Sequence, residues 1–330
     1  MRQIVLEDVG RLSDRRVPIP VPEAGEALVR IRRVGICGTD FHAFGGVQAF
    51  FTYPRVLGHE IACEVVQVPA NERGICPRDR CAIEPYLSCG RCRACLFERP
   101  NCCENLRVLG VHVDGAMQAM FTIPVGLLHK SEKLSFDQLA LVEPLGVGAH
   151  AVERSGLKKG EEALVIGAGP IGLAVMQFAV AAGAKVVAVE QSESRRAFAE
   201  QFGVSALAQA GGRLADVVFD ATGSAAAMAA SLKSVAPGGR LVFVGLTKEP
   251  VSIDDVWLHK NEVTLYASRN SCHQFPRIIQ MIEQGKIDTR PWITNRLNLG
   301  DVPQLFAEIR RQPTTIKAMI EVSEADSDRE

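Results

Sequence analysis

The chain has 330 residues, of which 47% are hydrophobic. This length exceeds what one ordinary hydrophobic core supports, so we expect two domains. Lys and Arg total 37 against 38 for Asp and Glu, and this balance argues against a nucleic-acid partner or binding to an anionic membrane. Charge therefore points to no polymeric partner.

The first ten residues, "MRQIVLEDVG", lack the apolar run and the cleavage site of a secretory signal. We therefore expect a reducing, cytoplasmic compartment. Ten cysteines, five of them within residues 89–103, fit metal binding in that compartment better than a disulfide framework.

Two sequence patterns divide the chain. To about residue 130, short alternating or apolar segments such as 26–35, 60–68 and 80–86 indicate a β-rich part. From about residue 160, strands alternate with helices, which is typical of a parallel sheet flanked by helices. The expected strands are 163–167, 185–190, 215–223 and 240–246, and the expected helices are 170–183, 194–203 and 225–239. Toward the end we expect helices within 275–288 and 302–312, a strand at 316–322 and a frayed acidic tail at 323–330.

The 22 residues from 163 to 184 carry no charge, which is about the length of a membrane-spanning helix. The glycines and proline of "GAGPIG" interrupt this run after a strand's length of apolar residues. We therefore expect a buried strand, a tight turn and a buried helix here.

The same "GAGPIG" predicts a dinucleotide site. Gly167, Gly169 and Gly172 follow an apolar strand and open a helix, and Pro170 suits the first helical turn. Glycines at these places let the backbone approach a pyrophosphate at the helix N-terminus. The alternative is that they serve only the packing of helix against strand.

Glu190 ends the next strand, 18 residues after Gly172. A carboxylate there accepts hydrogen bonds from an adenosine ribose and repels a 2′-phosphate, so NAD is favoured over NADP. Arg195 and Arg196 follow closely and could meet a phosphate, although on a helix such residues more often face water.

Two groups of residues suggest metal sites. Cys89, Cys92, Cys95 and Cys103 are separated by two, two and seven residues, and four thiolates without a free position make a closed structural zinc site. Cys102 is one thiol too many, a bystander or an occasional disulfide partner. A second, scattered set consists of Cys37, His59, Glu60 and Glu143, for which spacing alone equally allows a core thiol, a capping histidine and surface carboxylates.

The order of "GICGTDFH", "VLGHE", the cysteine loop, "VEPLGVGAH", "GAGPIG" and "FDATGS" resembles the zinc-dependent medium-chain alcohol and polyol dehydrogenases over nearly the whole chain. Within that family, "FFTYPRVLGHE" and Glu at the third ligand position look most like the sugar-acid (galactonate 5-dehydrogenase-like), sorbitol and threonine dehydrogenases.

The resemblance implies an α/β protein with a GroES-like, β-rich catalytic domain and a Rossmann doubly wound parallel-sheet domain. The implied boundaries are 1–143 for the catalytic domain with its structural zinc loop, 144–275 for the Rossmann domain, and 276–330 for a return to the catalytic domain. By analogy with relatives, we also expect a homo-oligomer, either a dimer or a tetramer.

The resemblance also implies roles for single residues. Cys37, His59 and Glu143 would hold a catalytic zinc, with Glu60 beside it or as an exchangeable ligand, and the cysteine loop would hold a second, structural zinc. Thr39 and His42 match a proton relay to solvent. The cofactor-binding set is expected to be Gly167, Gly169, Pro170, Ile171, Gly172, Glu190, Thr222 and Asn270, the last within "SRN", where relatives approach the nicotinamide and substrate.

One departure from the family concerns residues 206–215. Relatives usually fit a further helix there, whereas this chain offers only a short segment. The Rossmann half is therefore expected to lack one helix.

The expected reaction is NAD-dependent oxidation of a secondary alcohol of a polyol or sugar acid, with zinc acidifying the hydroxyl. One alternative is a threonine-type amino alcohol dehydrogenase, which uses the same ligand set. An alternative of another class is a non-enzymatic, structural zinc-binding protein.

Overall fold

The computed structural model describes residues 1–48 and 51–327. Phe50, the first residue of the phrase "FFTYPRVLGHE", and residues 328–330 of the acidic tail lie outside the described residues.

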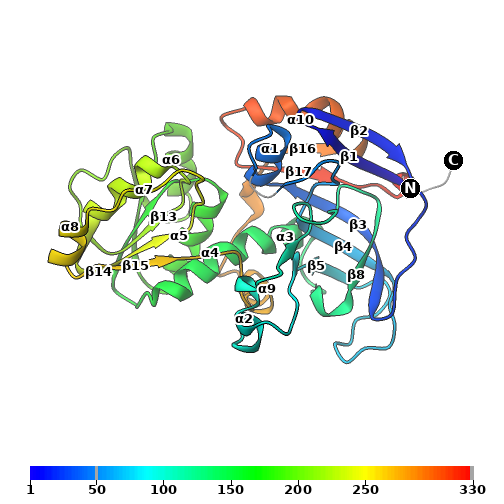
Figure 1. The fold of residues 1–330 in the computed structure, drawn as a ribbon, viewed down its shortest axis with the longest axis horizontal. Coiled ribbons are helices and arrows are strands. Elements are labelled where there is room, and N and C mark those ends of the chain that lie inside the picture. The colour runs from blue at the N-terminus through cyan, green and yellow to red at the C-terminus, as the bar shows by residue number, and fades with distance from the viewer. Residues whose placement is uncertain (49–50, 328–330) are drawn as a thin grey trace. The chain divides into compact units, whose positions relative to one another are not determined.

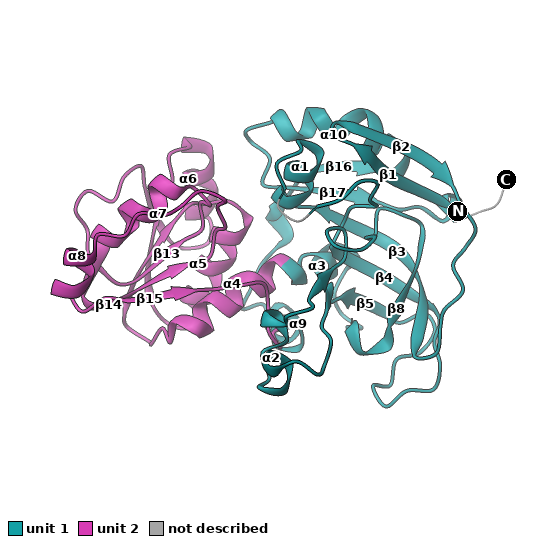
Figure 2. Ribbon diagram, viewed as in Figure 1, with its two compact units in different colours: residues 1–143, 275–330 teal, residues 144–274 magenta. Residues whose placement is uncertain are grey.

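The chain forms two compact units, coloured separately in Figure 2. Unit 1 comprises Met1–Glu143 and Phe275–Glu330, and unit 2 comprises Pro144–Gln274. The sequence prediction placed the end of the second domain at residue 275, one residue beyond the last residue of unit 2, Gln274.

Unit 1 is built on a seven-stranded sheet (Figure 1). Six of its strands follow the order β16-β17-β3-β4-β5-β9, and the seventh, β8, pairs with β3. Its strands are β3 (Glu26–Ile36), β4 (Glu60–Gln67), β5 (Arg80–Ile83), β8 (Met120–Pro124), β9 (Leu128–Lys130), β16 (Ile293–Asn298) and β17 (Lys317–Glu321). Two small antiparallel pairs accompany it, β1 (Arg2–Asp8) with β2 (Arg11–Arg16), and β6 (Tyr86–Leu87) with β7 (Arg107–Val108).

The helices of unit 1 are short. They are α1 (Gly38–Phe44), α2 (Arg93–Leu96), α3 (Phe136–Ala140), α9 (Phe275–Glu283) and α10 (Val302–Arg311). The apolar positions of α10 recur at helical spacing, and its buried residues Val302, Phe306 and Ile309 join the hydrophobic core of unit 1. The prediction of helices at 275–288 and 302–312 and of a strand at 316–322 is confirmed.

The C-terminal strand places its residues beside the N-terminal half of the chain. β17 runs antiparallel to β3, with Ala318 opposite Ile36, and β4 pairs with the other side of β3, with Glu60 opposite Gly35. The ends of three strands therefore meet next to Cys37, which precedes α1.

Unit 2 is a six-stranded parallel sheet with the order β12-β11-β10-β13-β14-β15. Its strands are β10 (Glu162–Ile166), β11 (Lys185–Val189), β12 (Ser205–Leu207), β13 (Ala215–Asp220), β14 (Val235–Phe243) and β15 (Thr264–Ala267). Its helices are α5 (Pro170–Ala181), α6 (Glu193–Glu200), α7 (Ala225–Ser231) and α8 (Asp255–Lys260), and α4 (Val142–Ser155) begins in unit 1 and continues into unit 2. This strand order is that of a doubly wound nucleotide-binding sheet, so the predicted fold class is confirmed.

Residues 163–184 form β10, a turn and α5, as expected. Among the described residues, no helix combines the length and the apolar character needed to cross a membrane. Between β12 and β13 the chain connects through residues 208–214 without a helix, which confirms the predicted shortening.

Two local predictions are wrong. The helix expected at 225–239 ends earlier, because β14 already begins at Val235, which pairs with Ala215 of β13. The tail is ordered through residue 327: Asp326 is buried and accepts hydrogen bonds from Arg2 and from the hydroxyl of Ser323, which fix residues that composition alone marks as frayed.

Candidate metal and cofactor sites

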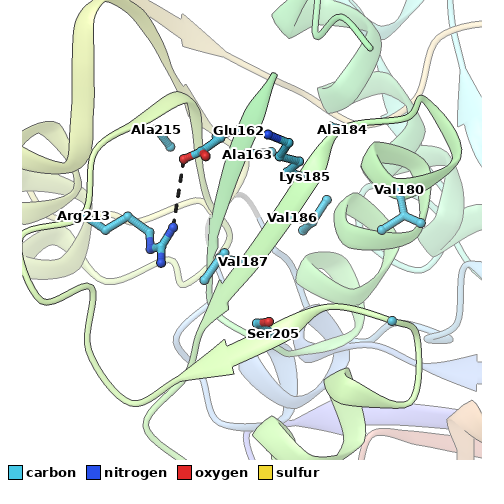
Figure 3. A pocket seen from close by; sticks show the side chains of 11 residues that line it. Glu162, Ala163, Val180, Ala184, Lys185, Val186, Val187, Ser205, Arg213 and Ala215 are labelled. Carbon is cyan, nitrogen blue, oxygen red and sulfur yellow. Dashed lines mark ion pairs between the residues drawn. The ribbon is translucent and has the colours of Figure 1, made fainter. Parts of the chain in front are cut away.

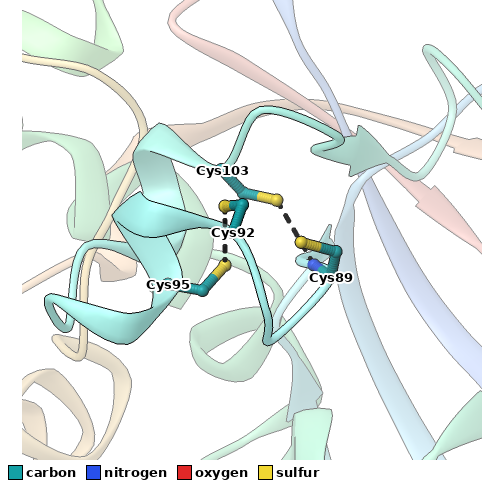
Figure 4. Close-up of side chains that lie close together, drawn as sticks. All are labelled: Cys89, Cys92, Cys95 and Cys103. Atoms are coloured by element: carbon teal, nitrogen blue, oxygen red, sulfur yellow. Dashed lines mark hydrogen bonds between the residues drawn. The ribbon is translucent and has the colours of Figure 1, made fainter.

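The four predicted zinc-binding cysteines lie together in unit 1. The sulfur atoms of Cys89, Cys92, Cys95 and Cys103 are all within 4.8 Å of one another and face a common centre (Figure 4). Four thiolates bound to one zinc ion at about 2.3 Å in tetrahedral geometry lie about 3.8 Å apart. The cysteine lobe, residues 88–106, therefore fits a closed tetrahedral zinc site.

Backbone amides favour ionised sulfur in this lobe. The N–H groups of Arg91 and Cys92 lower the pKa of Cys89 to about 6, whereas desolvation and the neighbouring thiols raise the pKa of Cys95 to about 11. The backbone N–H groups of Cys89 and Asn105 both donate to Cys103 Sγ at 3.3 Å. A bound divalent cation would favour ionisation of all four thiols, because it compensates the charge of the thiolates. Cys102 is exposed and is not in the group.

The second predicted set also lies in unit 1, with Cys37 half-buried and His59, Glu60 and Glu143 buried. One potential ligand atom each of Cys37, His59 and Glu60 lies within 4.8 Å of the others. Glu143 is not in this group, but it is buried and close enough for its charge to act on His59 and Glu60. The structure thus brings the scattered residues of the sequence into one region.

Each carboxylate of this region has a fixed partner. Lys317 Nζ donates to both oxygens of Glu60, at 2.5 and 2.7 Å, and both side chains are almost completely buried. The hydroxyl of Tyr86 donates to Glu143 Oε1. Glu60 therefore shares its charge with an ammonium group, whereas Glu143 has a neutral donor on one oxygen.

His59 is oriented by an aspartate that spacing did not single out. Nδ1 of His59 faces Asp40 Oδ1 at 3.8 Å, and the carboxylate of Asp40 accepts hydrogen bonds from the backbone N–H groups of Cys37, at 2.9 Å, and Gly58, at 3.4 Å. Nδ1 makes no hydrogen bond with the described residues, but it lies on the side of Asp40, so Nε2 is the better candidate for the ligand nitrogen. A carboxylate behind a ligating imidazole is the usual arrangement around zinc.

The electrostatics of this set favour a bound cation. Burial opposes the charged imidazole, yet Asp40 and Cys37 raise the pKa of His59 well above its usual value. Burial also raises the pKa of Glu143, and the nearby Glu60 adds to this effect. In addition to burial, the charge of Glu60 raises the pKa of both Asp40 and Glu143, and a divalent ion would offset this crowding of negative charge. The donor set, one sulfur, one imidazole nitrogen and a carboxylate, is suitable for zinc.

The two predicted relay residues lie on α1. Thr39 Oγ1 is 3.7 Å from Cys37 Sγ and is half-buried, and His42, one helical turn further, is exposed. The pair therefore extends from the thiol of the metal set toward solvent.

The glycine turn lies where a doubly wound sheet binds nucleotides. It follows β10, whose neighbour β13 lies on the other side of the point where the strand order reverses. Gly167 has φ +96°, and a Cβ on Gly172 would lie 1.9 Å from the carbonyl oxygen of Gly167. Gly169 caps α5 and Pro170 and Ile171 begin it, so the helix N-terminus opens at the carboxyl end of the sheet.

The carboxylate of Glu190 is hydrogen-bonded to this turn. Its Oε2 accepts from the backbone N–H of Ala168 and its Oε1 from that of Ser192, both at 2.9 Å. Arg196 donates to the backbone carbonyls of Glu190 and Gln191, so its guanidinium is engaged, and Arg195 is half-buried on α6. The acid therefore sits beside the glycine turn with one lone pair of each oxygen still available for ribose hydroxyls.

Thr222 and Asn270 also lie in unit 2. The hydroxyl of Thr222 donates to Asp220 Oδ1 at 2.7 Å, directly after β13. Asn270 follows β15 and has φ +53°, a conformation that Asn tolerates better than most residues.

A cavity of about 470 Å³ lies in unit 2 (Figure 3). Its walls come from the first residues of β10, β11, β12 and β13, with Glu162 and Arg213 forming an ion pair across it. Nucleotides bind at the carboxyl ends of such strands, so this cavity at the opposite edge is not the cofactor site.

Sequence reasoning missed three residues of the metal region: Asp40, Tyr86 and Lys317. Asp40 is the third residue of α1 after Cys37, a position where an acid is also a common helix cap, so its sequence signal is ambiguous. Lys317 lies 257 residues from Glu60, and no spacing pattern connects them.

Comparison with known proteins identifies the family. A model of the alcohol dehydrogenase GroES-like domain matches residues 23–133, and a model of the zinc-binding dehydrogenases matches residues 170–284. The L-galactonate-5-dehydrogenase of Escherichia coli is 39% identical over 93% of this chain and 94% of its own length. The chain belongs to the zinc-dependent medium-chain alcohol and polyol dehydrogenases. It is therefore an enzyme, and the alternative of a non-enzymatic zinc protein falls away.

Solved structures of this family show the same fold. An alcohol dehydrogenase of Escherichia coli complexed with NADH has a TM-score of 0.92 at 26% identity, and covers 97% of this chain and 99% of its own. A putative zinc-binding dehydrogenase of Sinorhizobium meliloti bound to NADP has a TM-score of 0.90 at 30% identity, with 97% and 98% covered. Dehydrogenases of this fold thus occur with either nicotinamide cofactor.

Proposed function

We propose that this dehydrogenase oxidises a secondary hydroxyl of a sugar acid or polyol, with NAD as the hydride acceptor and two zinc ions per chain. The observation that carries the proposal is the grouping of Cys37, His59 and Glu60, with the buried Glu143 near them, in a chain that is 39% identical to an L-galactonate-5-dehydrogenase. The cysteine lobe would hold the second, structural ion.

We propose Glu143 rather than Glu60 as the third ligand of the catalytic zinc. Lys317 bonds both oxygens of Glu60, so coordination by Glu60 would disrupt a buried ion pair. Glu143 has a hydrogen bond from Tyr86 on Oε1, and its Oε2 is left for a cation. Three protein ligands leave one position for the substrate, as a catalytic site requires.

Zinc bound here supplies a Lewis acid that makes a substrate hydroxyl more acidic at neutral pH. The residues of the chain then have to remove its proton. Thr39, next to Cys37, accepts and passes on a proton through its hydroxyl, and the exposed His42 delivers it to solvent. An imidazole titrates near neutrality, which suits the solvent end of such a relay.

Glu190 supports the choice of NAD over NADP. Its carboxylate is held between the glycine turn and the start of α6 by two backbone N–H groups, so it cannot swing away from a 2′-phosphate. The guanidinium of Arg196 donates to the backbone carbonyls of Glu190 and Gln191 and is therefore engaged. A phosphate at the ribose would therefore meet negative charge.

We also propose a cytoplasmic homo-oligomer. The cytoplasmic location is supported by the cysteine lobe, because four thiolate ligands require cysteines that stay reduced.

The test is NADH formation with a panel of L-galactonate and other sugar acids, polyols and L-threonine. We expect turnover with a sugar acid or polyol and at least 10-fold lower kcat/KM with NADP than with NAD. Turnover confined to threonine would instead establish the amino alcohol alternative, and the absence of NADH formation with every member would contradict the proposal. Glu190→Gln should reduce the NAD preference, because only the charge is removed.

A further inference from the structure

Tyr86 lies between the two candidate metal sites. It occupies β6, and its side chain is 7% exposed. Its hydroxyl donates to Oε1 of Glu143, which is 6% exposed. A buried tyrosine hydroxyl usually has a partner, but this partner is a candidate ligand of the catalytic metal.

The ring of Tyr86 belongs to the other site. It packs in a buried cluster with Cys103 and Leu106, and Cys89, Cys92 and Cys95 pack against the same cluster. The strand that carries it pairs with β7, with Tyr86 opposite Val108, so both ends of the cysteine lobe are held at this strand. The position of the hydroxyl is therefore set by the cysteine lobe.

We infer that Tyr86 is a positioning residue that ties Glu143, as a ligand of the catalytic zinc, to the cysteine lobe. This inference rests on the proposed function. The hydrogen bond restrains Oε1 of Glu143 and so limits the rotamers of this side chain. The position of Oε2, the oxygen proposed to bind zinc, is limited with it. A ligand restrained in this way loses less freedom when it binds a metal, and loss of such an outer partner typically weakens metal binding about 10–100-fold.

Metal release measures this effect directly. Wild type, Tyr86→Phe and Tyr53→Phe, each prepared as the two-zinc protein, are exposed to a soluble chelator, and the zinc remaining per chain is followed with time. Tyr53→Phe is the matched control, because it also removes one hydroxyl of unit 1, which donates to the carbonyl of Ala43 at 2.6 Å. We expect Tyr86→Phe to release one of its two ions about 10–100-fold faster than wild type, and Tyr53→Phe to match wild type.

Two further readouts separate positioning from a general structural effect. With Co²⁺ in place of zinc, the visible spectrum of the single-thiolate site should change in Tyr86→Phe, whereas the bands of the four-thiolate site should not. In addition, Tyr86→Phe combined with Glu143→Gln should release metal at the rate of Glu143→Gln alone, because Tyr86 acts through that carboxylate.

If wild type holds two ions and Tyr86→Phe shows wild-type zinc release and a wild-type spectrum, this inference is overturned and the proposed function stands. Additive effects of Tyr86→Phe and Glu143→Gln on zinc release would have the same consequence. A wild-type protein that binds a single ion would overturn the proposed function together with this inference.

Discussion

His59 depends on a neighbour that binds no metal itself. Asp40 is completely buried, faces Nδ1 of the imidazole and is fixed by two backbone N–H groups. The negative charge of Asp40 on the Nδ1 side favours a proton on Nδ1, which leaves the lone pair of Nε2 for a metal.

Asp40→Asn should therefore weaken zinc binding at the catalytic set about 10–100-fold, because the amide does not stabilise the same imidazole form. The measurement is zinc retained per chain after dialysis against a chelator. Asp326→Asn is the control, since Asp326 is also buried and bonded, but to Arg2 and Ser323. Equal retention by the two variants would contradict the assigned role of Asp40.

At the scale of elements, most of the fold could be predicted because the signals are local. The glycine turn, the apolar strands of unit 2 and the shortened connection at residues 208–214 are each readable within a few residues. The errors arose where distant partners decide the structure: β14 starts at Val235 because β13 lies beside it, and the tail is ordered because Asp326 meets Arg2.

The turn between β10 and α5 allows a sharp test. Gly172→Ala places a methyl group 1.9 Å from the carbonyl oxygen of Gly167, so the turn must shift and the helix N-terminus moves with it. We expect the Kd for NADH, measured by the fluorescence of the bound cofactor, to rise at least 10-fold.

Gly126→Ala is the control for this substitution, because a Cβ at Gly126 meets nothing within 4 Å. Unchanged NADH affinity in Gly172→Ala would show that the turn does not hold the pyrophosphate.

At the scale of the whole molecule, ion pairs between residues far apart in the sequence stabilise unit 1. Asp137 on α3 accepts from Arg33 Nε of β3 at 2.8 Å and from Arg296 Nη2 of β16 at 2.6 Å. Such long-range pairs explain what the sequence could not indicate. Lys317 reaches Glu60 because β17 pairs with β3 in the sheet, and Tyr86 reaches Glu143 from β6, the strand that leads into the cysteine lobe. No periodicity or spacing records these contacts.

Asp137 gives the fold a predicted pH dependence. Although desolvation opposes its charge, Arg296 and Arg33 lower the pKa of Asp137. Its contribution to stability is therefore present above the unfolded-state pKa of about 3.9, and it is lost as the pH falls through the lower pKa of the folded state.

Asp137→Asn should accordingly reduce the free energy of unfolding by about 1–2 kcal/mol at pH 7, and the difference from wild type should shrink below about pH 4. The measurement is the urea unfolding midpoint across this pH range. Glu249→Gln removes the same charge from an exposed residue and should leave the midpoint within error. A difference that grows on acidification would have the wrong sign for this account.

Zinc content measured beside activity tests the catalytic metal set most directly. Wild type should contain two zinc ions per chain by elemental analysis and reduce NAD. Cys37→Ser should retain one zinc ion and an unchanged circular dichroism spectrum, because the cysteine lobe keeps its own four sulfur ligands. It should lose turnover, because the catalytic zinc loses one of its ligands. Fully active wild-type protein with a single zinc ion, held by the cysteine lobe, would contradict the account.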